Sequence, residues 1–280
     1  MKKSYAVIGL GLMGGSLAQA IRRRIPDARV IGISRSPASL RTAKTKRFIH
    51  EGTSDLRSGI QNADFIILCT PVDIISKLLR HIDRWARPGT IVTDVGSAKA
   101  EIVRRAGVLK RIHFVGSHPM AGSHRAGLAE ARADLFENAF VFVTPDARTH
   151  RQSLKGVQVF WKRLKSRVVT LAPNRHDQIV SEISHLPHAV AFLLMRAASS
   201  PSLHFAASGF RDMTRIAQSD PHLWTPILLQ NRKFLIPSLK SLEKQISSLR
   251  RLLQRRADHS LFRLLSQAQG KRLKLQAKTV

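Results

Sequence analysis

The chain has 280 residues, 43% of them hydrophobic and 23% charged, which is the balance of a globular protein with room for two domains. No apolar run approaches the roughly 18 residues that a membrane-spanning helix needs, so we do not expect a membrane protein. The formal net charge of +29 would suit a nucleic-acid binder, but no zinc-ligand spacing or RNA-recognition motif accompanies it, so we expect it to reflect a general basic bias or to attract an anionic cofactor and substrate.

The ends of the chain and its cysteine content predict a cytoplasmic protein. Met1 to Lys3 lead straight into the first apolar run, so no signal peptide is expected. Cys69 is the single cysteine, which excludes an intramolecular disulfide and fits a reducing compartment. It lies in an apolar run, residues 65–69, and we therefore expect a buried thiol rather than a nucleophile.

A glycine-rich turn follows the first predicted strand, residues 5–8, and a helical pattern begins after it. In this GxGxxG pattern, the first glycine allows a tight turn, the second lets the backbone approach a pyrophosphate, and the third lets the helix pack close to the strand. The N–H groups of the first helical turn then face the phosphates. We expect a dinucleotide to bind at Gly9, Gly11, Leu12, Met13 and Gly14.

The end of the second predicted strand, residues 29–33, bears on the choice of cofactor. An NAD site usually carries a carboxylate there, which accepts from the ribose 2′-hydroxyl. This chain instead has Ser34, Arg35 and Ser36, and a guanidinium with hydroxyl groups would bind a 2′-phosphate. We predict NADP as the cofactor, with NAD as the alternative if Arg35 is an ordinary surface charge.

The remaining pattern divides the chain near residue 172. Up to that point, apolar runs alternate with helical patterns, which predicts an α/β domain with a doubly wound parallel sheet (residues 1–172). The further strands are expected at residues 65–69, 90–94, 113–116, 140–144 and 167–170. From residue 173 onward only helical patterns occur, interrupted at Pro187, Pro226 and Pro237, which predicts an all-helical second domain (residues 173–280).

Two polar segments follow neighbouring strands of this sheet. His118 lies in the segment Gly-Ser-His-Pro-Met-Ala-Gly, directly after the strand at residues 113–115, and ligands of open parallel sheets bind outside the carboxyl ends of the strands. An imidazole at that place is suited to take a proton as hydride leaves a substrate. Ser97 ends the preceding strand in the same way and would hydrogen-bond the substrate or His118, or cap a helix beginning at Ala98.

Several motifs, taken in order, resemble the prephenate/arogenate dehydrogenase family of tyrosine biosynthesis over roughly residues 4–240. They are GLGLMGGSLA at 9–18, CTPV at 69–72, TDVGSAK at 93–99, GSHPMAG at 116–122, HD at 176–177, SHLPHAVAF at 184–192 and FRDMTRIAQSDPHLW at 210–224. The resemblance implies a Rossmann domain, a helical dimerisation domain, a homodimer, and oxidative decarboxylation of prephenate or arogenate, a cyclohexadienol, with NAD or NADP. It also implies that Thr70 and Pro71 contact the cofactor.

The resemblance further assigns roles within the site. It implies that His118 is the catalytic histidine, that Ser97 assists it, and that Arg215 holds a substrate carboxylate. His185 and His188 match the histidine-bearing segment that faces the substrate, and the sequence leaves open which of them points inward.

One position departs from the family's pattern. Many relatives have an acidic residue in the segment after the histidine loop, where this chain has His124. The choice between prephenate and arogenate therefore stays open, with His124 as a candidate substrate-binding residue. No metal site is predicted. The alternatives are another two-domain NAD(P)-dependent dehydrogenase or reductase, and a non-catalytic NADP-sensing or nucleic-acid-associated protein built on the same fold.

Overall fold

The computed structural model describes residues 3–122 and 127–277. Two compact units, residues 1–232 and residues 233–280, make up the chain. The domain boundary predicted near residue 172 lies inside the first unit and stays a prediction. No helix within the described ranges is long and apolar enough to cross a membrane.

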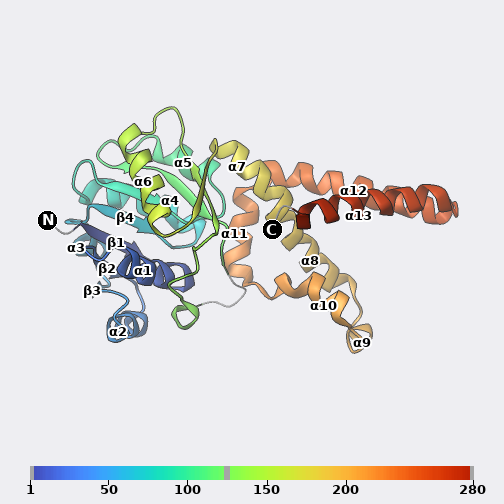
Figure 1. Ribbon diagram of the computed structural model, residues 1–280, viewed down its shortest axis with the longest axis horizontal. Helices are drawn as coiled ribbons and strands as arrows, with labels where there is room; N and C mark the ends of the chain where they lie inside the picture. Colours follow the sequence, from blue (N-terminus) through green and yellow to red (C-terminus); the bar gives the residue numbers. More distant parts are fainter. Residues whose placement is uncertain (1–2, 123–126, 278–280) are drawn as a thin grey trace. The chain divides into compact units, whose positions relative to one another are not determined.

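Six parallel strands form the main sheet of the first unit, in the order β3-β2-β1-β4-β5-β6 (Figure 1). Their bounds are β1 Ser4–Ile8, β2 Arg29–Ile33, β3 Glu51–Thr53, β4 Phe65–Leu68, β5 Ile91–Asp94 and β6 His113–Phe114. The strand order turns back at β1 and β4, and this reversal is where such folds bind nucleotides. The predicted doubly wound parallel sheet is thus confirmed, and the short β3 is the strand that the sequence pattern did not indicate.

Helices cover both faces of this sheet because alternate residues of each strand point to opposite sides. Tyr5 and Val7 pack with the helices α1 and α6 on one face. Ala6 and Ile8 pack with α3, α4 and α5 on the other. The helices of this part are α1 Leu12–Arg24, α2 Pro37–Thr45, α3 Leu56–Ile60, α4 Val72–Trp85, α5 Ala100–Ala106 and α6 Arg151–Arg163.

A second, three-stranded sheet corrects the expectation of one continuous parallel sheet. Its strands are β7 Gly116–Pro119, β8 Phe140–Thr144 and β9 Arg167–Thr170, in that order. β7 pairs antiparallel with β8, and β9 pairs parallel with it. The single strand predicted at residues 113–116 is therefore divided between β6 and β7, and the histidine segment is itself a strand rather than a loop.

The helical part of the first unit begins directly after β9. It consists of α7 Pro173–Val180, the π-helical turn η2 Ser181–His185, α8 Leu186–Ala197, α9 Ser200–Leu203, α10 Ser208–Thr214, the 3-10 turn η3 Arg215–Gln218 and α11 Pro221–Gln230. Pro187 explains the π-helical turn, because proline has no N–H to donate to the carbonyl of Ile183 and its ring crowds that carbonyl. The break predicted at Pro187 is thus a widened turn rather than an end of the helical path.

The second unit is helical as well, in agreement with the predicted all-helical C-terminal part. It contains nearly all of α12 (Arg232–Gln254) and α13 (Asp258–Ala277), joined by a short turn in which Arg256 has a φ of 46°. Pro237 lies inside α12, near its start. Several large apolar side chains of these helices are exposed, among them Ile246, Leu253 and Phe262.

Candidate active site

The glycine turn between β1 and α1 has the geometry that its sequence predicts. Gly9 has a φ of +96°, and a Cβ there would lie 2.8 Å from the carbonyl oxygen of Cys69. A Cβ on Gly14 would lie 1.8 Å from the carbonyl oxygen of Gly9, so only glycine lets α1 approach β1 this closely. A Cβ on Gly11 would meet no heavy atom within 4 Å, which leaves open space beside the backbone at this point.

The start of α1 can hold an anion. Gly11 is the N-cap residue, no side chain caps the helix, and its first turn carries no acidic residue. The N–H groups of this turn, which includes Leu12 and Met13, therefore keep their capacity for phosphate oxygens. Together with the open space beside Gly11, this arrangement fits the pyrophosphate of a dinucleotide.

The segment after β2 also offers donors to an anion. Ser34 Oγ accepts from the backbone N–H of Ser36, at 3.2 Å, and Ser36 Oγ caps α2 by accepting from the N–H of Ser39, also at 3.2 Å. Arg35 lies exposed between the two serines. The structure thus places Ser34, Arg35 and Ser36 together at the N-terminus of α2.

Cys69 and Thr70 connect the glycine turn to the polar centre of the site. The Cys69 Cβ lies 3.2 Å from the place of a Cβ on Gly14. Burial, with a smaller contribution from the negative charge of Asp94, raises the pKa of the Cys69 thiol far above its usual range. Cys69 is only partly buried, in contrast to the buried thiol expected, but it packs against the hydrophobic core, and its raised pKa argues against a nucleophile. Thr70 follows it with a buried Oγ1 that has no hydrogen-bond partner among residues 3–122 and 127–277, and Pro71 is the exposed N-cap residue of α4.

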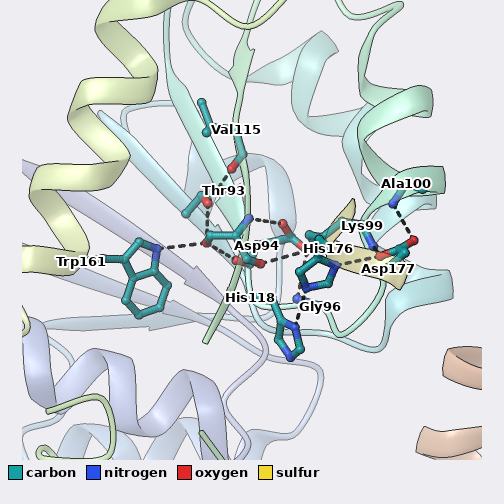
Figure 2. Close-up of polar contacts among 11 residues, drawn as sticks. Thr93, Asp94, Gly96, Lys99, Ala100, Val115, His118, Trp161, His176 and Asp177 are labelled. Atoms are coloured by element: carbon teal, nitrogen blue, oxygen red, sulfur yellow. Dashed lines mark hydrogen bonds and ion pairs between the residues drawn. The ribbon is translucent and has the colours of Figure 1, made fainter. Parts of the chain in front are cut away.

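A buried ion pair fixes the end of β5. Lys99 and Asp94 are both completely buried, and the Lys99 ammonium group donates to the Asp94 carboxylate and, at 3.0 Å, to the carbonyl oxygen of Ser117. Asp94 also accepts from the N–H groups of Gly96, at 2.9 Å, and Ser117, at 3.1 Å. Figure 2 shows this network, which ties the loop after β5 to the start of β7.

His118 projects from β7 next to this network (Figure 2). Its Nδ1 lies 2.9 Å from Nε2 of His176, on α7, and 7% of the residue remains exposed. Burial lowers the pKa of His118 well below its ordinary value, and the neighbouring His176, Lys99 and His185 lower it further. The imidazole is therefore neutral at neutral pH, which is the form that can accept a proton.

His176 is in turn held by Asp177. Its Nδ1 lies 2.7 Å from Oδ1 of Asp177. The Asp177 carboxylate also accepts from the backbone N–H groups of Lys99 and Ala100, at 2.8 and 2.9 Å, and so caps α5 from a distant part of the chain. The prediction that Ser97 caps a helix beginning at Ala98 is therefore wrong, because α5 begins at Ala100 and Asp177 supplies the cap.

His185 and His188 have different surroundings. His185 is completely buried, with its ring against the Ser97 backbone, and its Nδ1 accepts from Nδ2 of Asn231 at 2.8 Å. His188 is only partly buried, stacks on Trp224 with ring centroids 3.5 Å apart, and donates from Nδ1 to the carbonyl oxygen of Ser184 at 2.9 Å. Nε2 of His188 is thereby left as the atom that can meet a ligand.

Arg215 lies near His188 at the start of η3, which packs against α8. Burial lowers the pKa of His188, and the positive charge of Arg215 contributes in the same direction. Arg215 is exposed and forms no ion pair within the described part of the chain. The structure thus brings His188 and Arg215 together, and separately brings His118 next to His176. His124 lies outside the described residues.

The sequence does not indicate a role for two residues of this site. His176 and Asp177 belong to a motif of the family resemblance but have no predicted role, although both lie within the hydrogen-bond network around His118. A histidine-aspartate pair in the first turns of a helix has no local signal of function. Only the approach of α7 to α5 and β7, across 58 residues of sequence, reveals it.

Comparisons with known proteins agree with this geometry. The sequence model for "Prephenate dehydrogenase, nucleotide-binding domain" matches residues 17–170, and that for "Prephenate dehydrogenase, dimerization domain" matches residues 172–267. A prephenate dehydrogenase from Bacillus subtilis is 36% identical over 97% of this chain and 76% of its own length.

Solved structures are similar over nearly the whole chain. A prephenate dehydrogenase from Aquifex aeolicus, in complex with hydroxyphenyl propionate and NAD⁺, has a TM-score of 0.91 and 31% identity, covering 98% of this chain and 99% of its own. An arogenate dehydrogenase from Synechocystis has a TM-score of 0.82 and 33% identity, covering 97% of this chain and 99% of its own. On the matched motifs, the fold and these relatives, the chain belongs to the prephenate dehydrogenase family.

Proposed function

We propose that this protein is an NAD(P)-dependent dehydrogenase that oxidatively decarboxylates prephenate or arogenate. The observation that carries the proposal is His118, a neutral imidazole on β7 beside the ion pair of Lys99 and Asp94, which lies at the end of β5 of the main sheet. Its Nδ1 is engaged by His176, so Nε2 is the nitrogen that remains for a substrate.

The chemistry needs one base and good positioning. His118 Nε2 accepts the proton of the substrate's C4 hydroxyl while the C4–H bond breaks and its electron pair leaves as hydride. The bond from C1 to the carboxylate breaks as well, carbon dioxide departs, and that electron pair completes the aromatic ring. His118 then returns the proton to the phenol oxygen. When bound, the nicotinamide ring supplies the hydride acceptor, and the protein's task is to align the two reactants.

Arg215 and His188 are the substrate-binding residues that we propose. Arg215 is exposed and forms no ion pair among the described residues, so its guanidinium can make a bidentate contact with a substrate carboxylate. His188 lies close enough for the two charges to interact, and its Nε2 can hydrogen-bond the same ligand. Of the two histidines left open by the sequence, we therefore assign His188 to the substrate and His185 to the packing around Ser97. Ser97 remains the proposed assistant to His118.

We infer NADP as the cofactor on the segment after β2. Arg35 lies between two serine hydroxyl groups at the N-terminus of α2, and this combination suits the dianionic 2′-phosphate. Replacing Ser34→Asp together with Arg35→Ala should shift the preference toward NAD. An unchanged ratio of kcat/KM for NADP and NAD would contradict this assignment.

We also propose that the protein is a homodimer in the cytoplasm. The second matched sequence model is that of a dimerisation domain, and large apolar side chains such as Leu193, Ile246 and Phe262 are exposed in the matched segment. Sedimentation equilibrium should give twice the mass of the chain. A monomer at micromolar concentration would contradict the dimer.

The activity is tested by supplying prephenate and arogenate, each with NAD and with NADP, and following the absorbance of the reduced nicotinamide. We expect turnover of at least one substrate, and a loss of about 10³-fold in kcat for His118→Asn because the base is removed. His150→Asn is the matched control, since His150 lies outside the site, stacked on His113 with ring centroids 4.2 Å apart. Absence of turnover with all four pairs, or full activity of His118→Asn, would overturn the proposal.

A further inference from the structure

We propose that His176 and Asp177 are positioning residues for His118: their hydrogen-bond chain holds the proton of the neutral His118 ring on Nδ1 and leaves Nε2 free as the proton acceptor. The catalytic meaning of this arrangement rests on the proposed function. The location of the His118 proton is independent of the proposed function, because it is a property of the protein alone and can be measured without substrate.

The chain of contacts is short and buried. It runs from Oδ1 of Asp177 to Nδ1 of His176, at 2.7 Å, and from Nε2 of His176 to Nδ1 of His118, at 2.9 Å. His176 is completely buried and Asp177 is 2% exposed. Figure 2 shows the His118 and His176 rings joined through these nitrogen atoms, with Asp177 beside His176. Water therefore cannot replace either contact without a rearrangement of the protein.

Asp177 sets the direction of every hydrogen bond in this chain. Its carboxylate only accepts, and the backbone N–H groups of Lys99 and Ala100 hold it in place from the N-terminus of α5. His176 must therefore donate from Nδ1. A neutral imidazole carries one N–H, so Nε2 of His176 accepts, and His118 must donate to it from Nδ1. The proton of His118 is thus placed by a carboxylate that it does not touch.

The surrounding charges favour the neutral form of both rings. The groups that face His118 are His176 from α7, Lys99 from the loop before α5 and His185 from η2, and burial together with these three lowers the pKa of His118. Burial likewise lowers the pKa of His176, against the opposing effect of Asp177 and Asp94 and with the help of Lys99. When His118 takes a proton, its Nδ1–H still donates to His176, so the ring does not need to turn during the reaction.

A purely structural role would look different. Asp177 would cap α5 equally well without His176, since the two backbone N–H groups reach separate carboxylate oxygens. Loss of a cap alone lowers stability but leaves the tautomer of His118 and the activity of folded protein unchanged. The tautomer is therefore the decisive readout.

The first experiment is nitrogen NMR of the whole chain labelled with ¹⁵N-histidine, with the His118 signals assigned by their loss in His118→Asn. In the unmodified protein at neutral pH, we expect His118 to be protonated on Nδ1. Asp177→Leu removes the acceptor of Nδ1 of His176, so the proton of His176 is no longer held there and a fraction of His118 should become protonated on its own Nε2. A wild-type His118 protonated on Nε2, or the same tautomer in both proteins, would overturn the inference.

The second experiment measures kcat and KM for three variants of the full chain. His176→Leu removes the acceptor of His118 and Asp177→Leu removes the acceptor of His176, and each should lower kcat by about 10²-fold with little change in KM. His176→Gln places an amide oxygen near the position of Nε2 and should restore most of the rate. Glu101→Gln is the control for the helix start, because it removes a partly buried carboxylate from the first turn of α5 without touching His176.

The two proposals fail in distinguishable ways. If no substrate is turned over but the tautomer of His118 changes in Asp177→Leu, the inference stands and the proposed function fails. If prephenate or arogenate is oxidised and both His176→Leu and Asp177→Leu keep full kcat, the function stands and the inference fails. If a variant does not fold, the tautomer of His118 in the unmodified protein still tests the inference.

Discussion

The glycine turn follows β1 of the main sheet, the histidine cluster lies between β7 of the second sheet and α7, and the two are built in different ways. At the turn, backbone conformation is decisive: Gly9 has a left-handed φ, and Gly14 brings a helix within reach of a carbonyl oxygen. In the cluster, side chains are decisive: His118, His176 and Asp177 meet through hydrogen bonds between β7 and α7. Substitutions in the turn should therefore act through steric clashes. Substitutions in the cluster should act through lost charges and hydrogen bonds.

The largest effect is expected at the buried ion pair that supports the cluster. Lys99→Met leaves the Asp94 carboxylate buried without its cation, and removing one partner of a buried pair costs about 3 to 5 kcal/mol. Urea unfolding should show this loss. Adding Asp94→Asn to the variant should recover part of it, because the uncompensated charge is then removed. Arg104→Met, which breaks an exposed pair with Glu101, should leave the urea midpoint nearly unchanged, and an equal loss there would contradict an electrostatic cause.

A somewhat smaller loss is expected from a single methyl group in the turn. Gly14→Ala places a Cβ 1.8 Å from the backbone oxygen of Gly9, which cannot move aside without breaking the turn, and should cost about 3 kcal/mol in urea unfolding. Gly15→Ala is the matched variant on the same helix. Its Cβ would meet the end of the Leu128 side chain at 2.4 Å, which can rotate away, and the Cβ of Ala131 at 2.8 Å, in the segment after η1 rather than in the turn, so it should cost less than a clash with the Gly9 backbone. Equal losses in the two variants would mean that side-chain packing around α1, rather than its contact with the Gly9 backbone, excludes a larger residue.

The same contrast explains what the sequence could predict. The glycine turn, its strand and its helix depend on residues within one short segment, so their spacing alone predicted the nucleotide site. The partner of His118 could not be found in this way, because α7 reaches β7 only through tertiary packing. The antiparallel pairing of β7 with β8 was missed for a similar reason: the segment after residue 115 contains glycine and proline, which favour a loop, and pairing with β8 overrides that preference.

Acid should weaken the cluster more than the turn. Burial lowers the pKa of His185 to about 4, whereas the unfolded chain binds its proton near pH 6.5. The free energy of unfolding is therefore unaffected by the titration of this residue above pH 6.5. Below that pH it falls by about 1.4 kcal/mol per pH unit because of His185 alone. The free energy of unfolding should be measured in urea between about pH 7.5, above the pKa of histidine in the unfolded chain, and about pH 4.5, below it. It should fall with pH at this rate.

His185→Asn tests the origin of that slope. Asparagine keeps an oxygen that can accept from Asn231 but cannot take up a proton, so the contribution of His185 to the slope should disappear. His222→Asn, at an exposed position on α11, is the control and should keep the full slope. If His185→Asn loses stability in acid as steeply as the unmodified protein, the buried histidine is not its source.

The smallest change in stability is expected where the turn meets the cofactor. Gly11→Ala adds a Cβ that comes within 4 Å of no heavy atom in the described part of the chain, at a φ of −91° that alanine readily adopts, so the free energy of unfolding should change by less than about 1 kcal/mol. The same methyl group occupies the space through which the backbone would approach the pyrophosphate, and the Kd for NADPH should rise at least about tenfold, measured by fluorescence titration. Gly209→Ala is the matched control, since its Cβ also meets nothing within 4 Å but lies on α10, and it should leave NADPH binding unchanged. Unaltered NADPH binding by Gly11→Ala would show that the dinucleotide does not pass beside this residue. The glycines of the turn would then be needed for folding alone.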